Sequence, residues 1–593
     1  MKRLISILLA AALLFAAAMP VRAQELTPAD DALLLNELLA EQEANPAEEP
    51  PLNGAELELL PPEALELALP LPEDISSLEN PEAAEETEEE SSTDESEPAE
   101  DAAATMKATA LTADLKTADV SMYPTITLAG GSHALFLNEG TPEQEVVYNP
   151  ANTGGIVKEY ITPVIKSLLK FDIDGVVDSI VEVLWRTFGP VAMDENGESI
   201  TDGITCNRHT YYTSNINSNE IFFGFDWRQD PMKTADDLKE FMEYVRTKRG
   251  PVEKFNLVGT SGSGSVVLAY MQQHGYDDLA SLVMNISLHN GIEMFGALAK
   301  GEVALGAEAT GKLDADLSNL GVNLRLQPWL RILYETGLLS VLSKTTKSGI
   351  RPWVRRTYVE AVIPLIFMMP GYWTFVPPED YEAAKAYLFR ENPTKYAGLI
   401  AKIDRYHNDV AMKSDAIILE ASKHFKVAIR AGYGKPSWPL GEDTGVQSDG
   451  MVETFRASLG ATGSPVDEPF PYWYKQKIDD GHNRISPDRY VDASTCLLPE
   501  QTWFSYKMSH TWEISYSGWY EWWLKTDNPT VDNEKFPQFS EMTEPKVFVT
   551  REAEPQTKAV SLLKSIGLWI LKAWRWLLLL PLFWVKWWYQ KYI

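Results

Sequence analysis

Residues 255 to 264 read Phe255-Asn256-Leu257-Val258-Gly259-Thr260-Ser261-Gly262-Ser263-Gly264. An apolar strand, predicted over residues 255–259, runs into a serine flanked by small residues, and a helix predicted over residues 266–273 follows directly. This order is typical of the sharp turn that lifts a nucleophilic serine above a sheet. Ser261 is therefore the candidate nucleophile.

Small residues are needed two positions before and two positions after such a serine, because the strand and the helix nearly touch there. Gly259 satisfies the first position, whereas Ser263 stands where glycine is usual. The N–H of Gly262 is expected to donate one hydrogen bond to an oxyanion. The competing interpretation is a Gly/Ser-rich turn without chemistry. A phosphate-binding loop is excluded, because no lysine follows the glycines.

The globular part, predicted over residues 120–545, alternates strands with helices. An amphipathic helix is predicted at 236–247, and strands are predicted at 125–128, 221–227, 255–259, 283–287 and 426–430. This alternation predicts an α/β fold with a mostly parallel sheet covered on both faces. The helical pattern from about 297 to 421, with an apolar patch at 362–369, predicts a cap or lid inserted between late strands.

A nucleophilic serine needs a general base, and the chain has eight histidines. In the α/β-hydrolase fold the acid follows the serine and the histidine comes last, which leaves His407, His424, His482 and His510. His510 follows a predicted strand and a polar turn near the end of the globular part. His482 lies in an Asp-Asp-Gly-His-Asn segment that is typical of a surface turn. We favour His510 as the base and keep His482 as the alternative.

The candidate acid is Asp449, which lies in a glycine-flanked turn between the strand at 426–430 and His510. A carboxylate at this point would fix the tautomer of the histidine ring and stabilise the imidazolium that forms. An Asp-Gly pair taken alone is more often only a turn. Asp443 is the alternative acid.

Together these residues resemble the lecithin:cholesterol acyltransferase-like family of α/β-hydrolases over most of residues 123–525. Besides the serine turn, the resemblance is carried by Gly131-Ser132 with Leu135, Phe225-Asp226-Trp227-Arg228, Met369-Pro370-Gly371-Tyr372-Trp373, Tyr433-Gly434 and Asp449-Gly450-Met451-Val452. It implies a triad of Ser261, Asp449 and His510, with a backbone amide near Gly131 and Ser132 as second oxyanion donor. Two features depart from the family: Thr260 replaces the usual histidine, and the early loop lacks the Pro-Gly step followed by a bulky apolar residue.

The reaction expected of these residues is attack of Ser261 on an ester carbonyl, with release of the acyl group to water or an alcohol. The expected protein is an esterase or lipase acting on lipid or other acyl-ester substrates, without metal or cofactor. Two alternatives stay open: an inactive binding protein that keeps the fold, and an amide or peptide hydrolase with the same triad. Asp226 and Arg228 are interpreted as a structural ion pair and are left out of the site.

The first part of the chain predicts export. Residues 1–23 combine Lys2 and Arg3 with an apolar run and small residues before Gln24, which is typical of a secretory signal peptide, and of a bacterial one in its composition. Residues 24–115 are predicted to be a disordered acidic leader, because 26 acids and no Lys or Arg lie between Gln24 and Thr105. The remaining residues carry 59 acids against 52 bases, so no basic nucleic-acid surface is indicated.

The last segment, residues 556–593, is predicted to be a membrane anchor. It contains six tryptophans, a residue that prefers the bilayer interface, and a narrow cationic stripe of Lys564, Lys572, Arg575 and Lys586. A helix lying on an anionic membrane surface is favoured over a spanning helix at 566–585, because Lys572 and Arg575 would then lie near mid-bilayer. A disulfide between the two cysteines and two free thiols remain equally open. The sequence is silent on oligomeric state.

Overall fold

The computed structural model describes residues 119–550, with gaps at 129, 131–132, most of 150–171, 207–215, 303–352, 391, 438–444, 467, 509, 511–517 and 544–546. The described residues belong to one compact unit. The predicted signal peptide (1–23), acidic leader (24–115) and C-terminal anchor (556–593) lie outside the described residues.

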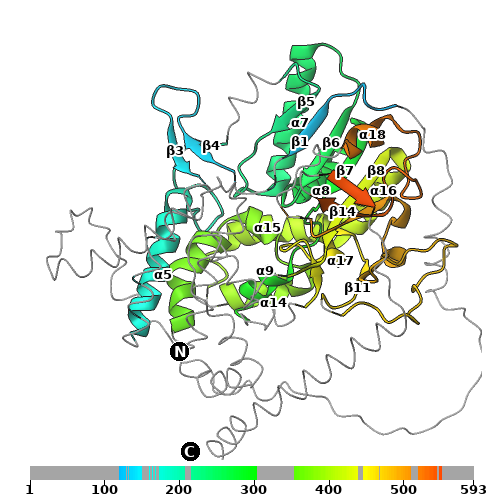
Figure 1. The fold of residues 1–593 in the computed structure, drawn as a ribbon. Coiled ribbons are helices and arrows are strands. Elements are labelled where there is room, and N and C mark those ends of the chain that lie inside the picture. Colours follow the sequence, from blue (N-terminus) through cyan, green and yellow to red (C-terminus); the bar gives the residue numbers. More distant parts are fainter. Residues whose placement is uncertain are drawn as a thin grey trace, which may run out of the picture. The chain divides into compact units, whose positions relative to one another are not determined.

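An eight-stranded sheet forms the centre of this unit, in the spatial order β15-β14-β13-β8-β7-β6-β1-β5 (Figure 1). Seven strands are parallel, and β15 pairs antiparallel with β14 at one edge. The prediction of an α/β fold with a mostly parallel sheet is thus confirmed. The strands are β1 (Thr125–Leu128), β5 (Glu220–Phe223), β6 (Phe255–Thr260), β7 (Leu279–Asn285), β8 (Lys426–Tyr433), β13 (Thr502–Tyr506), β14 (Phe539–Thr543) and β15 (Val547–Thr550).

The strand order reverses between β1 and β6, because β5 adds on one side of β1 and the later strands add on the other. At such a reversal the chain leaves neighbouring strands in opposite directions, which opens a crevice at their carboxyl ends. Ser261 follows β6 at this point, and Gly130 follows β1. The topology therefore places the candidate nucleophile where α/β sheets usually bind ligands.

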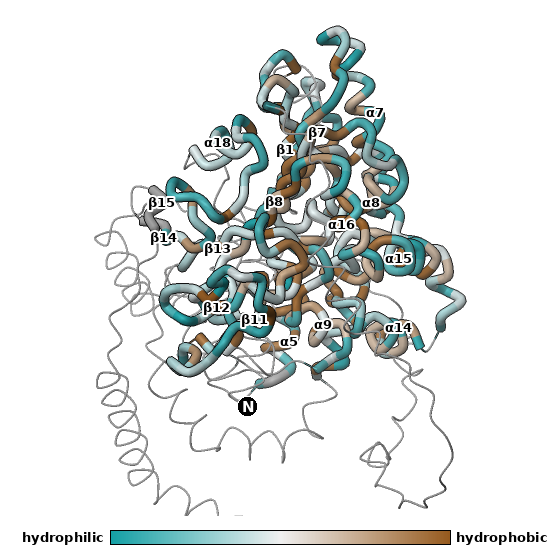
Figure 2. Tube along the Cα trace, turned by 90° about the vertical axis from the view of Figure 1, so that its right-hand side faces the viewer, coloured by the Kyte–Doolittle hydropathy of each residue, from teal (hydrophilic) through white to brown (hydrophobic). Residues whose placement is uncertain are grey.

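Alternate residues of the central strands face opposite layers, as the period of a strand requires. Leu257 and Leu282 pack in a core shared with α7 (Pro231–Arg249), α8 (Ser263–His274) and α16 (Ser414–His424). Val258 and Val283 pack on the other face against tryptophans of α18 (Trp519–Lys525). Figure 2 shows hydrophobic residues along β1 and β7 and hydrophilic ones on the outer turns of α7.

Helical segments fill the described part of the predicted cap range, 297–421. They are α9 (Glu293–Ala299, which begins just before it), the π-helix η3 (Tyr358–Phe367), α13 (Pro370–Trp373), η4 (Pro378–Asp380), α14 (Tyr381–Phe389), α15 (Ala397–Asp409), η5 (Ala411–Lys413) and α16. The predicted apolar patch at 362–369 lies in and just after η3. The final helix, α16, packs on α8 and β8 and so covers the sheet.

One long helix was not predicted. The sequence analysis places no element between residues 132 and 220, but α5 (Ile173–Phe188) lies there and packs against η3. Trp185 donates its indole N–H to the carbonyl of Glu360 at 2.7 Å. The helical layer formed by α5 and η3 is therefore built from two separate parts of the chain.

The remaining elements are short. A three-stranded sheet contains β2 (Leu135–Leu137), β3 (Glu145–Tyr148) and β4 (Ile204–Thr205), and two pairs join β9 (Lys435–Pro436) to β10 (Gln447–Ser448) and β11 (Thr462–Gly463) to β12 (Val491–Asp492). The single turns are η2 (Gly189–Val191), α17 (Thr454–Ala457), η6 (Ala493–Thr495) and η7 (Pro499–Gln501).

Two predicted strands run past the observed ends, whereas the strand predicted at 426–430 continues to Tyr433 in β8. The strand predicted at 283–287 ends at Asn285, because Ile286 has a φ of 44° and turns the chain out of the sheet. The strand predicted at 221–227 ends at Phe223. Both cysteines, Cys206 and Cys496, are buried and form no disulfide. Among the described helices, none has the length and apolarity needed to cross a bilayer.

Candidate active site

Ser261 occupies a tight turn between β6 and α8. Its φ is 54°, in the left-handed region that a non-glycine residue rarely adopts. The turn is compact: a Cβ added to Gly259 would lie 3.1 Å from Val267 and 3.5 Å from Gly264. The carbonyl of Ser261 accepts from the N–H groups of Gly264 and Leu288, at 3.1 and 3.0 Å. The strained residue is thus held from both sides by backbone contacts.

Ser263, the departure from the usual small-residue pattern, is part of this turn. Its hydroxyl oxygen accepts from the N–H of Thr260 at 2.8 Å and lies 2.8 Å from the Thr260 carbonyl and 3.1 Å from the Leu128 carbonyl. The close helix contact falls one residue later, because a Cβ on Gly264 would overlap Ser287. A serine is therefore accommodated at position 263, and its side chain links the turn to β1.

Three predicted side chains form one hydrogen-bonded chain. The hydroxyl of Ser261 lies 2.7 Å from Nε2 of His510, and Nδ1 of His510 lies 2.7 Å from Oδ2 of Asp449. With the proton of the neutral ring on Nδ1, Ser261 donates to the histidine, and the histidine donates to the carboxylate. The structure brings together residues that are 249 and 61 positions apart in the chain.

Asp449 is fixed by its own turn after β10. Its Oδ1 accepts from the N–H groups of Met451 and Val452, at 2.8 and 2.9 Å, while Oδ2 serves His510. Burial opposes ionisation of Asp449, but the electrostatic attraction and hydrogen bond of His510 and the two backbone donors outweigh it, so the pKa of Asp449 is lowered. A buried carboxylate that stays ionised can orient the histidine ring and stabilise its cationic form.

His510 follows β13 through a turn in which the N–H of Lys507 donates to the carbonyl of Tyr433 at 2.7 Å. The side chain of His510 is 13% exposed. The alternative base, His482, has a half-exposed side chain 3.4 Å from Asp532, away from the serine in its described contacts. The alternative acid, Asp443, lies outside the described residues.

The two other histidines that chain order left open have partners of their own. The ring of His407 stacks on Tyr381 with centroids 3.9 Å apart. The ring of His424 stacks on Tyr276 at 4.7 Å and bonds Glu420. Neither contact involves Ser261.

The predicted oxyanion donors are placed only in part. Gly262 is the N-cap residue of α8, and no hydrogen bond among the described residues uses its N–H. The positive end of the α8 dipole adds to the local field there. Gly131 and Ser132, the predicted second donors, lie outside the described residues.

Gly130, which the sequence analysis did not single out, packs directly against the candidate nucleophile, Ser261. A Cβ at Gly130 would lie 2.8 Å from Cβ of Ser261 and 3.1 Å from the carbonyl oxygen of Thr260. Only glycine allows the end of β1 to approach the serine this closely. The signal was the glycine pair at 130 and 131, one residue beyond a predicted strand.

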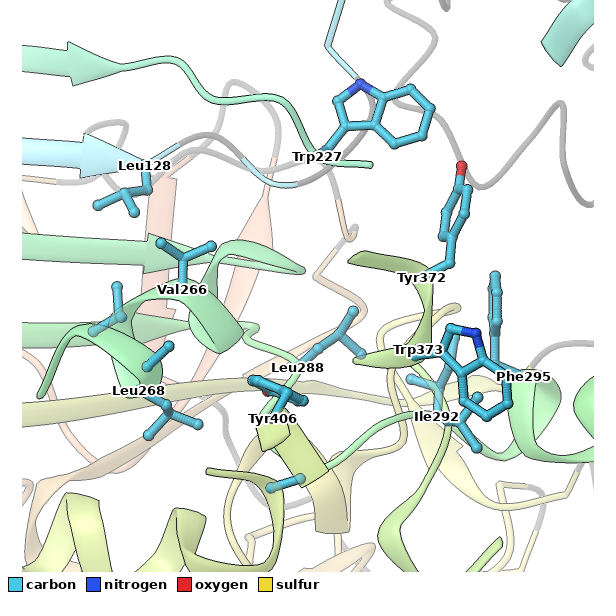
Figure 3. Close-up of a cluster of buried hydrophobic side chains, with 14 of the residues drawn as sticks. Leu128, Trp227, Val266, Leu268, Leu288, Ile292, Phe295, Tyr372, Trp373 and Tyr406 are labelled. Atoms are coloured by element: carbon cyan, nitrogen blue, oxygen red, sulfur yellow. The ribbon is translucent and has the colours of Figure 1, made fainter. Parts of the chain in front are cut away.

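A pocket of about 730 Å³, part of it open to solvent, adjoins Ser261 and Gly262. Its walls are mostly apolar and come from separate segments, and they include Trp227, Val266, Leu288, Ile292, Phe295 and Tyr372 (Figure 3). The ring of Tyr372 lies between those of Trp227 and Phe295, with centroid distances of 5.4 and 5.8 Å. The site therefore combines three hydrogen-bonded polar side chains with a mostly apolar, aromatic-lined space.

Asp226 and Arg228 form the predicted structural ion pair. The fully buried guanidinium of Arg228 contacts both carboxylate oxygens of Asp226, at 2.9 and 2.6 Å, and donates to the carbonyl of Val191 at 2.8 Å. These contacts join the segment after β5 to the cap side. In the described part of the chain, no cluster of His, Cys, Asp and Glu has the arrangement of a metal site.

Comparisons with known proteins add little to this geometry. No family model matches the sequence, and no curated protein matches it. A solved structure described as "The crystal structure of Tle4-Tli4 complex" is similar at 11% identity and a TM-score of 0.26, covering 64% of this chain and 88% of that one. At that TM-score the likeness supports no argument about function.

Proposed function

We propose that this chain is a serine hydrolase of the α/β-hydrolase type that cleaves or transfers acyl groups of lipid or other ester substrates. The observation that carries the proposal is the chain of 2.7 Å contacts from Ser261 through His510 to Asp449. In this order each group has a partner suited to its role as nucleophile, general base and orienting carboxylate. The chain order of serine, acid and histidine is that of α/β-hydrolases.

The reaction follows from these contacts. As the hydroxyl oxygen of Ser261 attacks the carbonyl carbon, its proton passes to Nε2 of His510, and Asp449 stabilises the resulting imidazolium. The N–H of Gly262 donates to the oxygen that becomes negative, and a backbone amide near Gly131 and Ser132 is the proposed second donor. His510 then returns the proton to the leaving alcohol, which leaves an acyl group on Ser261. Water or a second alcohol, deprotonated by His510, releases that group.

The pocket supports the proposed substrate class. Its walls are largely aromatic and aliphatic, so an acyl chain is a better occupant than a charged or sugar-like group. The resemblance to the lecithin:cholesterol acyltransferase-like family points the same way and remains part of the proposal. Export through residues 1–23 and attachment to an anionic membrane through residues 556–593 complete it.

The test combines active-site labelling with kinetics. A fluorophosphonate probe should label the native chain and Ser263→Ala but not Ser261→Ala. With a soluble p-nitrophenyl ester, His510→Ala should lower kcat by roughly 10⁴-fold, as loss of a triad member does. His482→Ala is the matched control and should retain most activity. Labelling that persists in Ser261→Ala, or a larger loss in His482→Ala, would contradict the proposal.

A further inference from the structure

Residues 470–478, here called the aromatic tip, present large apolar side chains to solvent. Trp473 is 68% exposed, Tyr472 is 56% exposed and Ile478 is 41% exposed. Tryptophan and tyrosine are costly to leave in water, and a cluster of exposed apolar side chains commonly marks an interaction surface. The tip lies in the long connection between β11 and β12.

Contacts at the two sides of Tyr472 and Trp473 hold the aromatic tip in its exposed position. The rings of Phe470 and Tyr474 stack with centroids 4.0 Å apart, and the hydroxyl of Tyr474 donates to Asp492 at 2.8 Å. Arg489 donates to the carbonyls of Phe470, Pro471 and Tyr474, at 2.9, 2.6 and 3.3 Å. These contacts fix the backbone on both sides of residues 472 and 473.

The segments that flank the aromatic tip contact the edge of the sheet at which Ser261 and His510 lie. Tyr433, the last residue of β8, donates its hydroxyl to Asp488 at 3.0 Å. Gln447, next to the turn that holds Asp449, donates to the carbonyl of Ser464 at 3.1 Å. The carboxyl ends of parallel strands share one edge of the sheet, so the connection between β11 and β12 starts from the edge where Ser261 and His510 lie.

The two charged residues of the aromatic tip itself are both lysines. Lys475 and Lys477 are exposed, and neither ammonium group has an ion-pair partner in the described part of the chain. The nearby acids lie outside the tip: Glu468 and Asp479 are exposed, Asp479 accepts from the N–H of Gly481 at 3.1 Å, and Asp480 pairs with Arg484 at 2.7 Å. The tip thus combines aromatic rings with two available cations.

We propose that the aromatic tip docks the globular part on an anionic lipid surface. Trp and Tyr rings favour the headgroup region of a bilayer, and lysines next to them are attracted by anionic headgroups. Docking at the triad edge would bring a lipid ester to the proposed active site. The docking itself does not depend on the proposed hydrolase activity, and it is separate from the predicted C-terminal anchor.

A fluorophore attached within the tip of the full chain tests the proposal. The native cysteines are buried, so Tyr472→Cys supplies an accessible thiol for an environment-sensitive nitrobenzoxadiazole label. Vesicles of phosphatidylcholine with phosphatidylglycerol should raise its fluorescence severalfold and shift it to the blue, whereas phosphatidylcholine alone should not. The same label on Met122→Cys, 75% exposed just before β1 at the opposite edge, should not respond.

Variants in the labelled background separate the contributions. Trp473→Ser should abolish most of the signal, and Lys475→Gln/Lys477→Gln should weaken vesicle affinity by roughly 30-fold, about fivefold for each lysine. The matched control is Lys248→Gln/Lys525→Gln, which removes the same charge from helix ends near the amino edge.

A tip label that stays in water while the chain binds vesicles would overturn the proposal, as would a chain that ignores anionic vesicles. A tip that responds only to a protein or a carbohydrate would do the same. Vesicle binding by Ser261→Ala separates this proposal from the hydrolase proposal. This variant should bind vesicles as the native chain does, whether or not Ser261 is a nucleophile. The lysine variants should hydrolyse a soluble ester at the native rate.

Discussion

The nucleophile side of the site has no charged residue from Phe255 to Met271, whereas the acid side has three buried ones between Asp449 and Arg456. The nucleophile is held by backbone shape: a residue in a left-handed conformation, glycines at close approaches and carbonyls that accept from neighbouring N–H groups. None of these contacts depends on ionisation. The position of Ser261 should therefore respond to added volume and remain indifferent to pH.

The acid side combines the backbone contacts of Asp449 with a cluster of buried charged residues that follows it. Arg456, 2% exposed, pairs with Glu293 and with Glu379, and Glu453 lies 3.9 Å from its Nε. Glu453 accepts from the hydroxyl of Ser437, and its other oxygen has no hydrogen bond in the described residues. Burial raises the pKa of Glu453 to about 7. The difference teaches that one hydrogen-bonded series of side chains can be supported by shape at one end and can have buried charges next to its other end.

The largest effect is expected from adding volume on the nucleophile side. In Gly130→Ala the new methyl group would meet Cβ of Ser261 at 2.8 Å and the Thr260 carbonyl at 3.1 Å, so one of them must move. A displacement of about 1 Å at a reacting group costs on the order of 100-fold in rate, and kcat on a soluble ester should fall by that amount at every pH.

The matched control for Gly130→Ala is Gly463→Ala. Its methyl group would meet Cγ of Gln447 at 3.2 Å, and the contact does not include Ser261. This variant should keep near-native kcat. Full activity in Gly130→Ala, or a loss confined to one end of the pH range, would break the comparison.

A smaller effect, on stability, is expected from Glu453→Gln. The folded pKa of about 7 lies above the ordinary value of 4.5, so Glu453 favours the folded state most when protonated. This contribution is complete below pH 4.5 and is lost as the pH rises through 7. Relative to Glu453→Gln, the native chain should lose up to about 3 kcal/mol of unfolding free energy across that window.

Urea denaturation at pH 4.5, 6 and 8 measures this difference directly. Glu468→Gln, on an exposed carboxylate, is the control and should track the native chain at each pH. A constant offset between the native chain and Glu453→Gln would mean that Glu453 does not titrate between the folded and unfolded states in this range.

The sequence predicted best the features that depend on residues close together in the chain. The serine turn needs only an apolar strand, small residues and a helix in succession, so Ser261 could be found from one decapeptide. Asp449 and His510 could be proposed because chain order restricts the choice, although each alone looks like an ordinary turn residue. The helix α5 also had a local signal, with Val176, Ile180 and Leu184 at helical spacing, and the prediction missed it.

Other features depend on tertiary contacts and could not be read from the chain. The pocket wall of Trp227, Phe295 and Tyr372 joins three segments that have no pattern in common. Glu453 and Arg456 have the spacing of a surface helix pair, yet both are buried because α17 packs on β8. The role of Ser263 was likewise hidden, because its partner Leu128 belongs to another strand.

The smallest expected effect concerns Ser263 and tests whether the nucleophile side is held by shape alone. Ser263→Gly restores the usual small-residue pattern but removes the acceptor of the Thr260 N–H and the link to Leu128. A lost buried hydrogen bond and a new helix glycine together should cost about 1–3 kcal/mol of unfolding free energy. The rate constant kcat should change less than tenfold, because Gly130 and the backbone contacts of Ser261 remain.

Ser263→Ala is the control for Ser263→Gly. It loses the same hydrogen bonds without the flexibility of glycine, so the difference between the two variants isolates the backbone contribution. Urea denaturation and ester hydrolysis measure the two effects, and a Ser263→Gly chain as stable as the native one would show that the side chain does not brace the turn.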